Sequence, residues 1–571
     1  MGTVKELCPL LFCLAMPAIA GDPLSQPTPT ETARLPVLVF RTDGRPIVDR
    51  THIPSTLQLL SFNDSAKSGE AKVDYEGQAE LSARGNSSYY FEKKSYRLEL
   101  QTGSGRDRKA SLLGMPADSD WVLYGSATDR SFARDILAHE LWRRMGHYAV
   151  RWRYVEVFLI TNQLVKAPSL AQDLGKEVPH VLAALSLNQP AAAALTFSNQ
   201  QNRLGSVLAD SYIGLYLLME KIKRGKDRVD VVKLRPTDNA EPEISGGYIL
   251  KKDDRGRNQR GLLTGQEFRV RYEEPKESEL TAVQKQWMAK YLEDFEKALM
   301  GPNFRDIANG YPKYIDIESF VDFHWLVELG KNADGFSFSQ YIHKDRGRPL
   351  SMGPVWDWDN AFGNPYFDLI RNTNGWRFET TDENDYSWYR RLFDDPDFLQ
   401  RYIDRWSELR ATILATSNVL AIVDGVANQL KGAHRRNSLR WEQEGRQASL
   451  RVWVGISYMD ELTVLKNWIT TRLNWIDSEA FPKPVANVKH AAKFGEFQVE
   501  LTCSAGRLFY TTNGADPRAR GGSVSRTAAE YTTPIALPPN LVITARARSD
   551  FGLWSARTII QLLQSHADQA R

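Results

Sequence analysis

The chain has 571 residues, which is too many for a single ordinary core, so we expect two or more domains. Hydrophobic residues make up 42% and charged residues 25%, a balance typical of soluble globular proteins and not of disordered or fibrous ones. The 73 basic and 70 acidic side chains leave a net charge of only +3, which gives no reason to expect nucleic acid or an anionic membrane as a partner.

The N-terminal stretch MGTVKELCPLLFCLAMPAIAGDP has the pattern of a secretory signal peptide. A lysine precedes the apolar run from Leu7 to Ile19, and small residues around Ala20 form a cleavage site. We expect cleavage after Ala20 (signal peptide 1–20) and a secreted or periplasmic mature chain, with a cytosolic protein as the alternative. No later stretch reaches the roughly 18 apolar residues of a membrane span, so the mature chain is expected to lack an integral membrane segment. Only Cys503 then remains, which excludes an intrachain disulfide and a cysteine zinc site.

Strands and one helix are predicted after a polar linker at residues 21–34. The alternating stretches LPVLVFRTDGRPI, STLQLLSFND and KSYRLELQT predict strands closed by turns. Apolar residues at helical spacing in DRSFARDILAHELWRRMG predict a helix that ends at Gly146. YVEVFLI and IGLYLLMEKI are predicted as buried strands, and the Ala-, Gln- and Asn-rich segment between them, about 163–210, as a partly helical insertion.

Helices dominate the predicted structure from residue 279 onward. Residues 279–330 and 384–480 are mostly helical in pattern, and FPKPV after the last helix is a Pro-punctuated linker. Residues 485–565 change to short strands and Gly/Pro turns, which predict a small β-sandwich. The fold class is therefore α+β, with a body at 35–480 and a separate β module.

Common enzyme motifs are missing from the chain. No G-x-S-x-G, Walker or G-x-G-x-x-G sequence occurs. His139 and Glu140 begin a zinc-protease pattern, but Arg143 stands where the second histidine would be needed.

Two basic stretches are candidate nucleotide-binding elements. ARGNSSYYFEKKSYRLEL carries Arg84, Lys93 and Lys94 on a turn that leads into a strand, and a strand lysine can point into a cleft and bind phosphate. The alternative is a solvated face. IGLYLLMEKIKRGKDRVDVVKL runs from an apolar strand through Met219 and Glu220 into a basic exit, like the passage where kinases bind adenine. The alternative is a buried strand that leaves the core.

Two acidic stretches are candidate sites of catalysis and metal binding. In FHWLVELGKNADGFSFSQYIHKD a helix is predicted to end near Gly330, which leaves Asn332 and Asp334 on the next loop as active groups or as cap and turn residues. In MGPVWDWDNAFGN, Asp357 and Asp359 stand on a hydrophobic stretch that predicts a buried strand, and buried carboxylates need partners. Mg²⁺ takes one or two carboxylates together with phosphate oxygens, which fits this pair.

Taken in order, the four stretches resemble the CotH family, the spore-coat-protein-H-like atypical kinases distantly related to the protein-kinase fold. The family's elements R-G-N-S with K-K-x-Y-R-L, G-x-Y-x-L-x-E-K-I, K-N-x-D-G and G-P-V-W-D-x-(D/N)-x-A-F-G-N all occur. They lie at 84–98, 214–222, 331–335 and 353–364, and the likeness extends over about 36–480 apart from the insertion. It implies an atypical protein-kinase-like body with a strand-rich N-terminal part and a helical C-terminal part.

The resemblance also implies a reaction and a set of site residues. The chain would transfer the γ-phosphoryl group of ATP, with Mg²⁺ or Mn²⁺, to a protein or other cell-surface acceptor such as a Ser/Thr hydroxyl, a glutamate or a glycan. The resemblance places the catalytic aspartate at Asp334. Ser339 stands five residues later, where many kinases have a metal-binding asparagine, and this argues against a second metal. The implied catalytic residues are Asp334 and Lys94, the nucleotide-binding residues Arg84, Lys93, Lys94, Met219, Glu220 and Lys221, and the metal ligands Asp357, Asp359 and Asn332.

The C-terminal region resembles the β-sandwich modules at the C-termini of chitobiases and hexosaminidases. FYTTNGADPR matches their Y-T-x-D-G-S-x-P turn, with Asn513 in place of the usual aspartate, and YTTPIAL and ITARARS follow. The likeness implies a spacer or surface adhesion unit without catalysis.

Two rival functions remain open. A secreted, Trp-rich chain with paired carboxylates is consistent with a glycoside hydrolase, whose two carboxyls lie about 5 Å or 6.5–9.5 Å apart. The absence of (β/α)₈ alternation argues against this alternative. The body is also consistent with the scaffold of a non-catalytic coat or cell-surface assembly protein. Metal-dependent binding of ATP separates the kinase from both.

Overall fold

The computed structural model describes the chain from residue 34 to 563 with internal gaps. The described residues are 34–47, 49–62, 71–85, 87–161, 211–253, 262–263, 265, 269–364, 368–445, 457–493 and 495–563. The predictions for the signal peptide, nearly all of the linker and the 163–210 insertion lie outside these residues.

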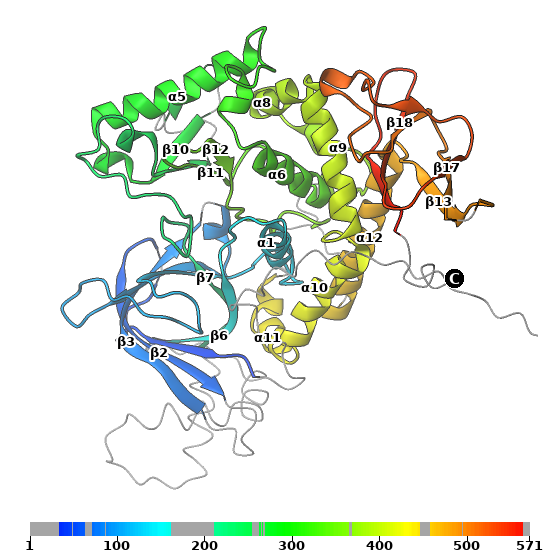
Figure 1. Cartoon of the computed structure of the whole chain (residues 1–571). Coiled ribbons are helices and arrows are strands. Elements are labelled where there is room, and N and C mark those ends of the chain that lie inside the picture. Colours follow the sequence, from blue (N-terminus) through cyan, green and yellow to red (C-terminus); the bar gives the residue numbers. More distant parts are fainter. Residues whose placement is uncertain are drawn as a thin grey trace, which may run out of the picture.

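Seven strands close into a barrel in the spatial order β1-β2-β3-β4-β5-β7-β6 (Figure 1). β1 and β6 are parallel, and the other neighbouring pairs are antiparallel. Alternate side chains point inward, where leucines, valines and tyrosines form one hydrophobic cluster. The strands are β1 (Val37–Arg41), β2 (Ile53–Phe62), β3 (Ala71–Arg84), β4 (Ser95–Gln101), β5 (Asp120–Tyr124), β6 (Trp152–Ile160) and β7 (Tyr212–Glu220).

The outer face of β3 and β4 carries the polar side chains that later face the site. In the register of this pair, Arg84 lies opposite Ser95 and Ser82 lies opposite Arg97. Their neighbours along the strands, Leu81, Ala83, Tyr96 and Leu98, are buried inside the barrel. The two-residue period of a strand therefore places both arginines outside the barrel.

Helices and a second sheet form the rest of the body. The sheet has the order β12-β11-β8-β10-β9, and α5 lies beside it (Figure 1). The strands are β8 (Tyr248–Lys252), β9 (Leu262–Leu263), β10 (Arg269–Glu274), β11 (Gln340–Lys344) and β12 (Leu350–Met352). The helices are α1 (Arg134–Arg144), α5 (Ala282–Met300), α6 (Ile317–Gly330), α7 (Asp368–Arg371), α8 (Glu383–Phe393), α9 (Pro396–Ala411), α10 (Thr416–Gln429), α11 (Ala433–Gly445) and α12 (Tyr458–Glu479).

Helix α6 lies at the centre of the body. Asp316 caps its N-terminus by accepting the Ser319 amide hydrogen, and Lys331 ends it in the left-handed conformation. Every residue from Ser319 to Gly330 is buried, because the helix is apolar on nearly all sides and packs among α1, α9, α12 and β12. The loop that follows it is thus held by a rigid core element.

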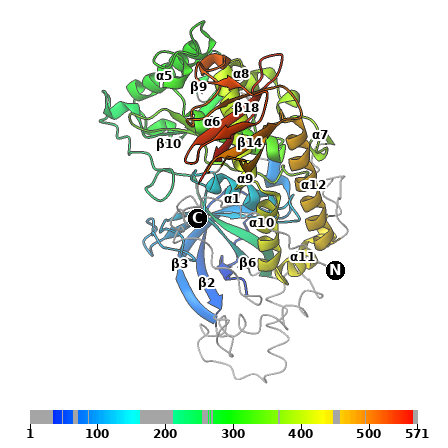
Figure 2. The same ribbon diagram turned by 45° about the vertical axis from the view of Figure 1, so that its right-hand side comes forward.

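The chain after Val485 contains two small sheets beside α9 (Figures 1 and 2). One has the order β13-β14-β17 and the other β16-β15-β18-β19, and Val499, Leu501 and Ile543 belong to their shared hydrophobic cluster. The strands are β13 (Val485–His490), β14 (Phe497–Thr502), β15 (Arg507–Thr511), β16 (Ala529–Glu530), β17 (Ile535–Leu537), β18 (Val542–Arg548) and β19 (Thr558–Gln561). The predicted change from helices to strands is confirmed.

Two local predictions of secondary structure are wrong, and one strand was missed. Lys93 and Lys94 lie in the turn between a 3-10 helix (Ser87–Tyr90) and β4, because the strand begins only at Ser95. β3 was missed as a strand. The segment with Asp357 and Asp359 is irregular and not a strand, because Pro354 has no amide hydrogen to continue the ladder of β12.

No single helix within the described residues is both long and apolar enough to cross a bilayer. The bent pair of α9 and α10 meets those criteria only when the two are taken together, by length and composition.

Candidate functional site

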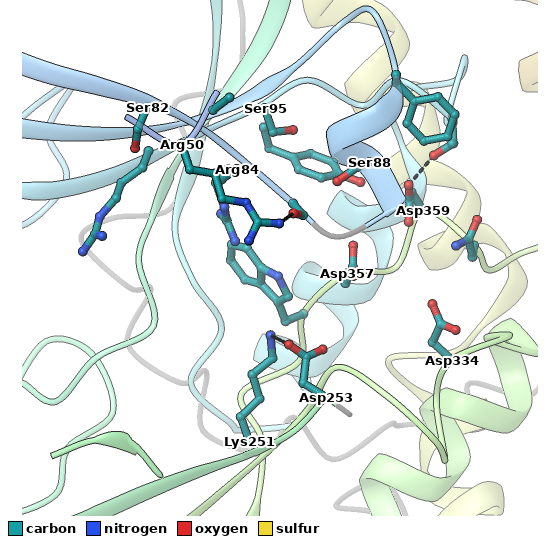
Figure 3. Close-up of a pocket in the computed structure, with 18 of the residues that line it drawn as sticks. Arg50, Ser82, Arg84, Ser88, Ser95, Lys251, Asp253, Asp334, Asp357 and Asp359 are labelled. Carbon is teal, nitrogen blue, oxygen red and sulfur yellow. Dashed lines mark hydrogen bonds and ion pairs between the residues drawn. The ribbon is translucent and has the colours of Figure 1, made fainter. Parts of the chain in front are cut away.

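A polar pocket of about 390 Å³ lies where the outer face of β3 and β4 meets the loops after β8, α6 and β12 (Figure 3). Acidic side chains come from these loops, and most of the basic ones come from the barrel side. The lining residues are Arg50, His52, Ser82, Ala83, Arg84, Gly85, Ser88, Phe91, Ser95, Arg97, Tyr124, Thr128, Lys251, Asp253, Asp334, Trp356, Asp357, Asp359 and Asn360.

Two backbone hydrogen bonds join the acidic loops. The Phe362 amide donates to the Gly330 carbonyl at 2.7 Å, and the Ala333 amide donates to the Asn360 carbonyl at 3.0 Å. Segments that lie far apart in the sequence are thereby fixed side by side. The loop after α6 places Asp334 in the same pocket as Asp357 and Asp359, the two aspartates of the D-W-D segment (residues 357–359).

Asp334 is oriented by the turn that ends α6. Asn332 accepts the Asp334 amide hydrogen on its side-chain oxygen at 3.0 Å, and the Asp334 carbonyl accepts the amides of Ser337 and Phe338. These bonds form a tight turn in which the carboxylate is left to face the pocket.

Asp357 has the left-handed backbone conformation, with φ of 67°. This conformation costs an ordinary residue on the order of 1–2 kcal/mol, and aspartate is among the residues that tolerate it best. Ser339 holds the side chain by donating its hydroxyl to Asp357 Oδ2 at 3.1 Å. This backbone conformation points the Asp357 carboxylate into the pocket. Its two neighbours in the chain, Trp356 and Trp358, are buried.

Asp359 is buried behind Asp357. Its carboxylate accepts a hydrogen bond from the Thr128 hydroxyl. Asn364 donates its side-chain amide to the Asp359 carbonyl at 2.6 Å and to the Thr128 carbonyl at 3.2 Å. The D-W-D segment is thus tied to the chain between β5 and α1.

The three carboxylates resist ionisation in each other's presence. Burial and the charge of Asp357 raise the pKa of Asp334 to about 6. Burial and the same charge raise the pKa of Asp359 to about 7. Burial also raises the pKa of Asp357, although Lys251 opposes the shift. A hard divalent cation with oxygen ligands would relieve this repulsion, so these donors fit Mg²⁺ or Mn²⁺.

The cations across the pocket have spare hydrogen-bond donors. Arg84 lies 5.2 Å over the ring of Trp356, and its Nη1 is buried without a hydrogen-bond partner among the described residues. Arg97 Nε is also buried without a hydrogen-bond partner among the described residues. Lys251 pairs with Asp253 at 2.7 Å. Guanidinium groups with free donors are suited to an anion with several oxygens, such as a polyphosphate.

The two lysines predicted to bind phosphate do not reach the pocket. Lys93 is buried, and its Nζ donates to the Leu215 carbonyl at 2.7 Å and to Asn437 Oδ1 at 2.9 Å. Burial lowers its pKa well below the usual value. Lys94 donates to the Tyr89 carbonyl at 2.5 Å. Lys93 thus joins β7 to α11, and Lys94 stabilises the turn before β4.

The predicted adenine-binding residues also lie away from the pocket. Glu220 is fully buried, accepts the Tyr148 hydroxyl at 2.9 Å and pairs with Arg151 at 3.1 Å. Met219 belongs to the main core, and Lys221 pairs with Asp120 on the barrel at 3.3 Å. The end of β7 thus has a packing role in the structure.

Several lining residues were not found from the sequence. Asn332 was predicted as a metal ligand, but it supports the turn, and Asn360 lines the pocket in its place. Asn360 directly follows the D-W-D run, so the motif itself contained a signal. Arg50, Lys251 and Asp253 carried none, because only the folded chain brings them near the motifs.

The fold and the pocket define an α+β protein in which a cluster of carboxylates faces guanidinium donors that have no hydrogen-bond partner among the described residues. The chain belongs to the CotH family, because the family model described as CotH kinase protein matches residues 81–476. This match covers most of the body. No curated protein was found to be similar to the chain.

Proposed function

We propose that the protein is a metal-dependent phosphotransferase of the CotH type, which transfers the γ-phosphoryl group of ATP to a protein or cell-surface acceptor. The observation that carries the proposal is the separation of charge within one pocket. Asp334, Asp357 and Asp359 lie on one side of the pocket, and Arg84 lies on the barrel side (Figure 3). Arg97, on β4 of the barrel, also lines the pocket. Phosphoryl transfer needs mainly positioning and neutralisation of charge, which such a pocket provides.

Each side of the pocket has its own task in this proposal. Asp357 and Asp359 hold the divalent cation, which when bound neutralises phosphate charge. Arg84 and Arg97, with Lys251, hold the phosphate oxygens in place of the lysines predicted from the sequence. Asp334 orients the acceptor hydroxyl and accepts its proton. Its pKa of about 6 suits a group that is ionised at neutral pH yet basic enough to take a proton.

We also propose that the body is a variant of the kinase fold, with the barrel as its N-terminal part and the helices as its C-terminal part. The support is the position of the pocket between the two and the family to which the chain belongs. In this proposal the mature protein works outside the cytoplasm, and the two C-terminal sheets are a sandwich that serves as a spacer or adhesion unit.

The test is incubation of the mature chain with γ-labelled ATP and Mg²⁺ or Mn²⁺, followed by measurement of self-labelling and of label on added surface proteins. We expect labelling that requires the metal and is lost in Asp334→Asn. Addition of unlabelled ATP should raise the melting temperature when the metal is present and leave it unchanged when the metal is absent. A scaffold protein or a glycoside hydrolase would show neither response.

A further inference from the structure

A histidine and two glutamates meet on the outer face of the barrel, at the edge of the pocket. One ligand atom from each of His52, Glu80 and Glu99 lies within 4.8 Å of the other two, and we call these residues the His52 cluster. His52 directly precedes β2 and lines the pocket, whereas the two glutamates belong to β3 and β4. Within the described part of the chain, no other three histidine, cysteine, aspartate or glutamate side chains bring their ligand atoms this close together.

The register of the strands places like charges opposite each other in this cluster. Glu80 of β3 faces Glu99 of β4, and Glu99 in turn faces Asp120 of β5. Like charges directly opposite on neighbouring strands destabilise a sheet. The acid at the end of the row is balanced, because Asp120 pairs with Lys221 at 3.3 Å and with Lys223 at 2.9 Å.

The two glutamates have no such cations. Among the described residues, Glu80 forms its only ion pair with His52, whose Nδ1 lies 3.1 Å from Glu80 Oε2, and Glu99 forms no hydrogen bond or ion pair through its side chain. Histidine is a cation only when it is protonated, and its neutral imidazole is the commonest metal ligand in proteins. A divalent cation between these side chains would remove the repulsion and bind the imidazole as well.

The chain before β2 is fixed in place, which positions the imidazole. The Ala83 amide donates to the Asp49 carbonyl at 3.0 Å, and the Arg50 side chain donates to the Gly85 carbonyl at 2.8 Å. Both bonds join this segment to the end of β3. Because the glutamates stand on paired strands, all three ligands are held by rigid elements, as a preorganised metal site requires.

We propose that the His52 cluster binds a transition-metal cation of the Zn²⁺ type at the edge of the pocket. One imidazole nitrogen and two carboxylate oxygens are ligands that suit zinc, whereas Mg²⁺ is bound through oxygen. Three protein ligands leave a fourth position for water or for a molecule in the pocket. This site is separate from the cation proposed at Asp357 and Asp359, and it requires neither a nucleotide nor phosphoryl transfer.

The test is calorimetric titration of the metal-free mature chain with ZnCl₂. The parent chain for this titration carries Asp357→Asn, so that the other proposed cation does not contribute. We expect the parent to bind one Zn²⁺. His52→Ala or Glu99→Gln, added to the parent, should each weaken binding at least about tenfold, because loss of even a supporting group around a metal commonly costs ten- to a hundredfold in affinity. Glu99→Gln removes no ion pair of the described chain, so its effect reports on the metal.

Two matched variants are the controls. His490→Ala removes an exposed histidine at the end of β13, far along the chain from the cluster. Glu76→Gln removes an exposed negative charge from the same face of β3, four residues or about 13 Å from Glu80. Both should bind Zn²⁺ as the parent does.

The contrary outcomes are distinct. A parent that binds no Zn²⁺, or equal affinity in the parent and His52→Ala, would overturn the inference. An equal loss in the control variants would mean that the surface attracts the ion without a defined site, and would overturn it as well. Anomalous diffraction at the zinc edge from Zn²⁺-soaked wild-type crystals is a second measurement. The ion should lie within roughly 2.0–2.2 Å of a His52 ring nitrogen and of a Glu99 oxygen, and an ion found elsewhere would contradict the proposal.

Discussion

At the scale of single residues, the crowded carboxylates make stability depend on pH. The pKa values of Asp334 (about 6) and Asp359 (about 7) lie above the usual value, so between about pH 4 and 7 the folded chain holds protons that the unfolded chain has lost. The free energy of unfolding of the metal-free chain should therefore fall as pH rises through this window, by on the order of 4 kcal/mol between pH 5 and pH 8. Urea unfolding at pH 5 and pH 8 measures the change.

The same experiment with saturating Mg²⁺ is its control. The cation favours the ionised carboxylates, so the fall between pH 5 and pH 8 should shrink or reverse. A metal-free stability that does not change over this interval would show that burial and neighbouring charge do not raise the pKa values of these carboxyl groups.

Two isosteric substitutions should separate metal binding from proton transfer. Asp357→Asn should abolish metal-dependent binding of ATP, because an amide is a poorer ligand for a hard cation. Without metal it should keep or slightly raise the melting temperature, because one repelling charge has gone. Asp334→Asn should still bind ATP and metal but transfer no phosphate. Thermal shift with and without ATP–Mg²⁺ measures ligand binding, and the labelling assay measures phosphoryl transfer. If the two aspartates had only a structural role, both variants would lose stability and their response to ATP–Mg²⁺ would not change.

The arginine in the pocket should matter more for ATP than the lysine in the adjoining turn. Arg84→Ala should weaken ATP–Mg²⁺ binding at least about tenfold, because lost charged hydrogen bonds cost roughly 1.5–3 kcal/mol. Lys94→Ala is the matched control and should change binding little, since its Nζ bonds to the Tyr89 carbonyl. Calorimetric titration measures the dissociation constant of ATP–Mg²⁺ for both variants. A larger loss of affinity in Lys94→Ala than in Arg84→Ala would show that the lysine, and not the arginine, binds the phosphates.

Some of the residues predicted for the site line the pocket and others lie away from it, for a physical reason. Asp334 and Asp357 were predicted as site residues, and both line the pocket, because short motifs fix the local turns that present them. Lys93 was assigned to phosphate, but it is buried against β7. A motif gives the identity of a residue but not the direction in which its side chain points. For Lys93 and Lys94 that direction depends on where β4 begins, which is one or two residues later.

At the scale of elements, the end of α6 determines the position of the D-W-D segment. A Cβ added at Gly330 would lie 3.1 Å from the Trp358 ring and 3.3 Å from Phe362. Gly330→Ala should therefore displace Trp358 and the aspartates beside it, with a loss of about 1 kcal/mol in stability and weaker binding of Mn²⁺. Chemical denaturation and metal titration measure these effects.

A second helical glycine gives the control. A Cβ at Gly425 in α10 meets no atom within 4 Å, so Gly425→Ala should be neutral or add about 0.5–1 kcal/mol of stability. Equal effects from the two substitutions would mean that α6 does not hold the site through close contact.

Strands with a strong alternation of apolar residues were predictable, and one without it was not. β3 presents Gly77, Ala79 and Ala83 on its inner side, so its apolar signal is weak, although it supplies Arg84 to the pocket. The order β5-β7-β6 and the closure of the barrel could not be predicted either, because they depend on pairings between distant segments.

At the scale of the whole molecule, one buried arginine joins the C-terminal sheets to the body. Arg546 on β18 pairs with Asp404 of α9 at 2.7 Å and with Asp516 at 2.6 Å. Arg546→Ala should cost about 3–5 kcal/mol in stability, because it removes the cationic partner of the buried Asp404 carboxylate. Calorimetry should show the C-terminal sheets melting earlier than the body, whereas Arg557→Ala, at an exposed ion pair, should have little effect.

The separability of residues 485–571 remains a prediction. Deleting them exposes Asp404 to water and does not leave it buried, so the body should stay folded and bind nucleotide as before. An insoluble body would contradict this expectation.

The left-handed backbone at Asp357 limits how this gene can lose the proposed activity and still encode a folded protein. At a φ of 67°, asparagine and glycine are the replacements that the backbone accepts without added strain. Asparagine also keeps the shape of the side chain and its acceptor for Ser339, and a single nucleotide change in an aspartate codon produces it. Descendants that abandon catalysis while keeping the fold should therefore carry asparagine here far more often than alanine. A survey of natural variants at this codon would therefore identify relatives that have lost catalysis before any of them is assayed.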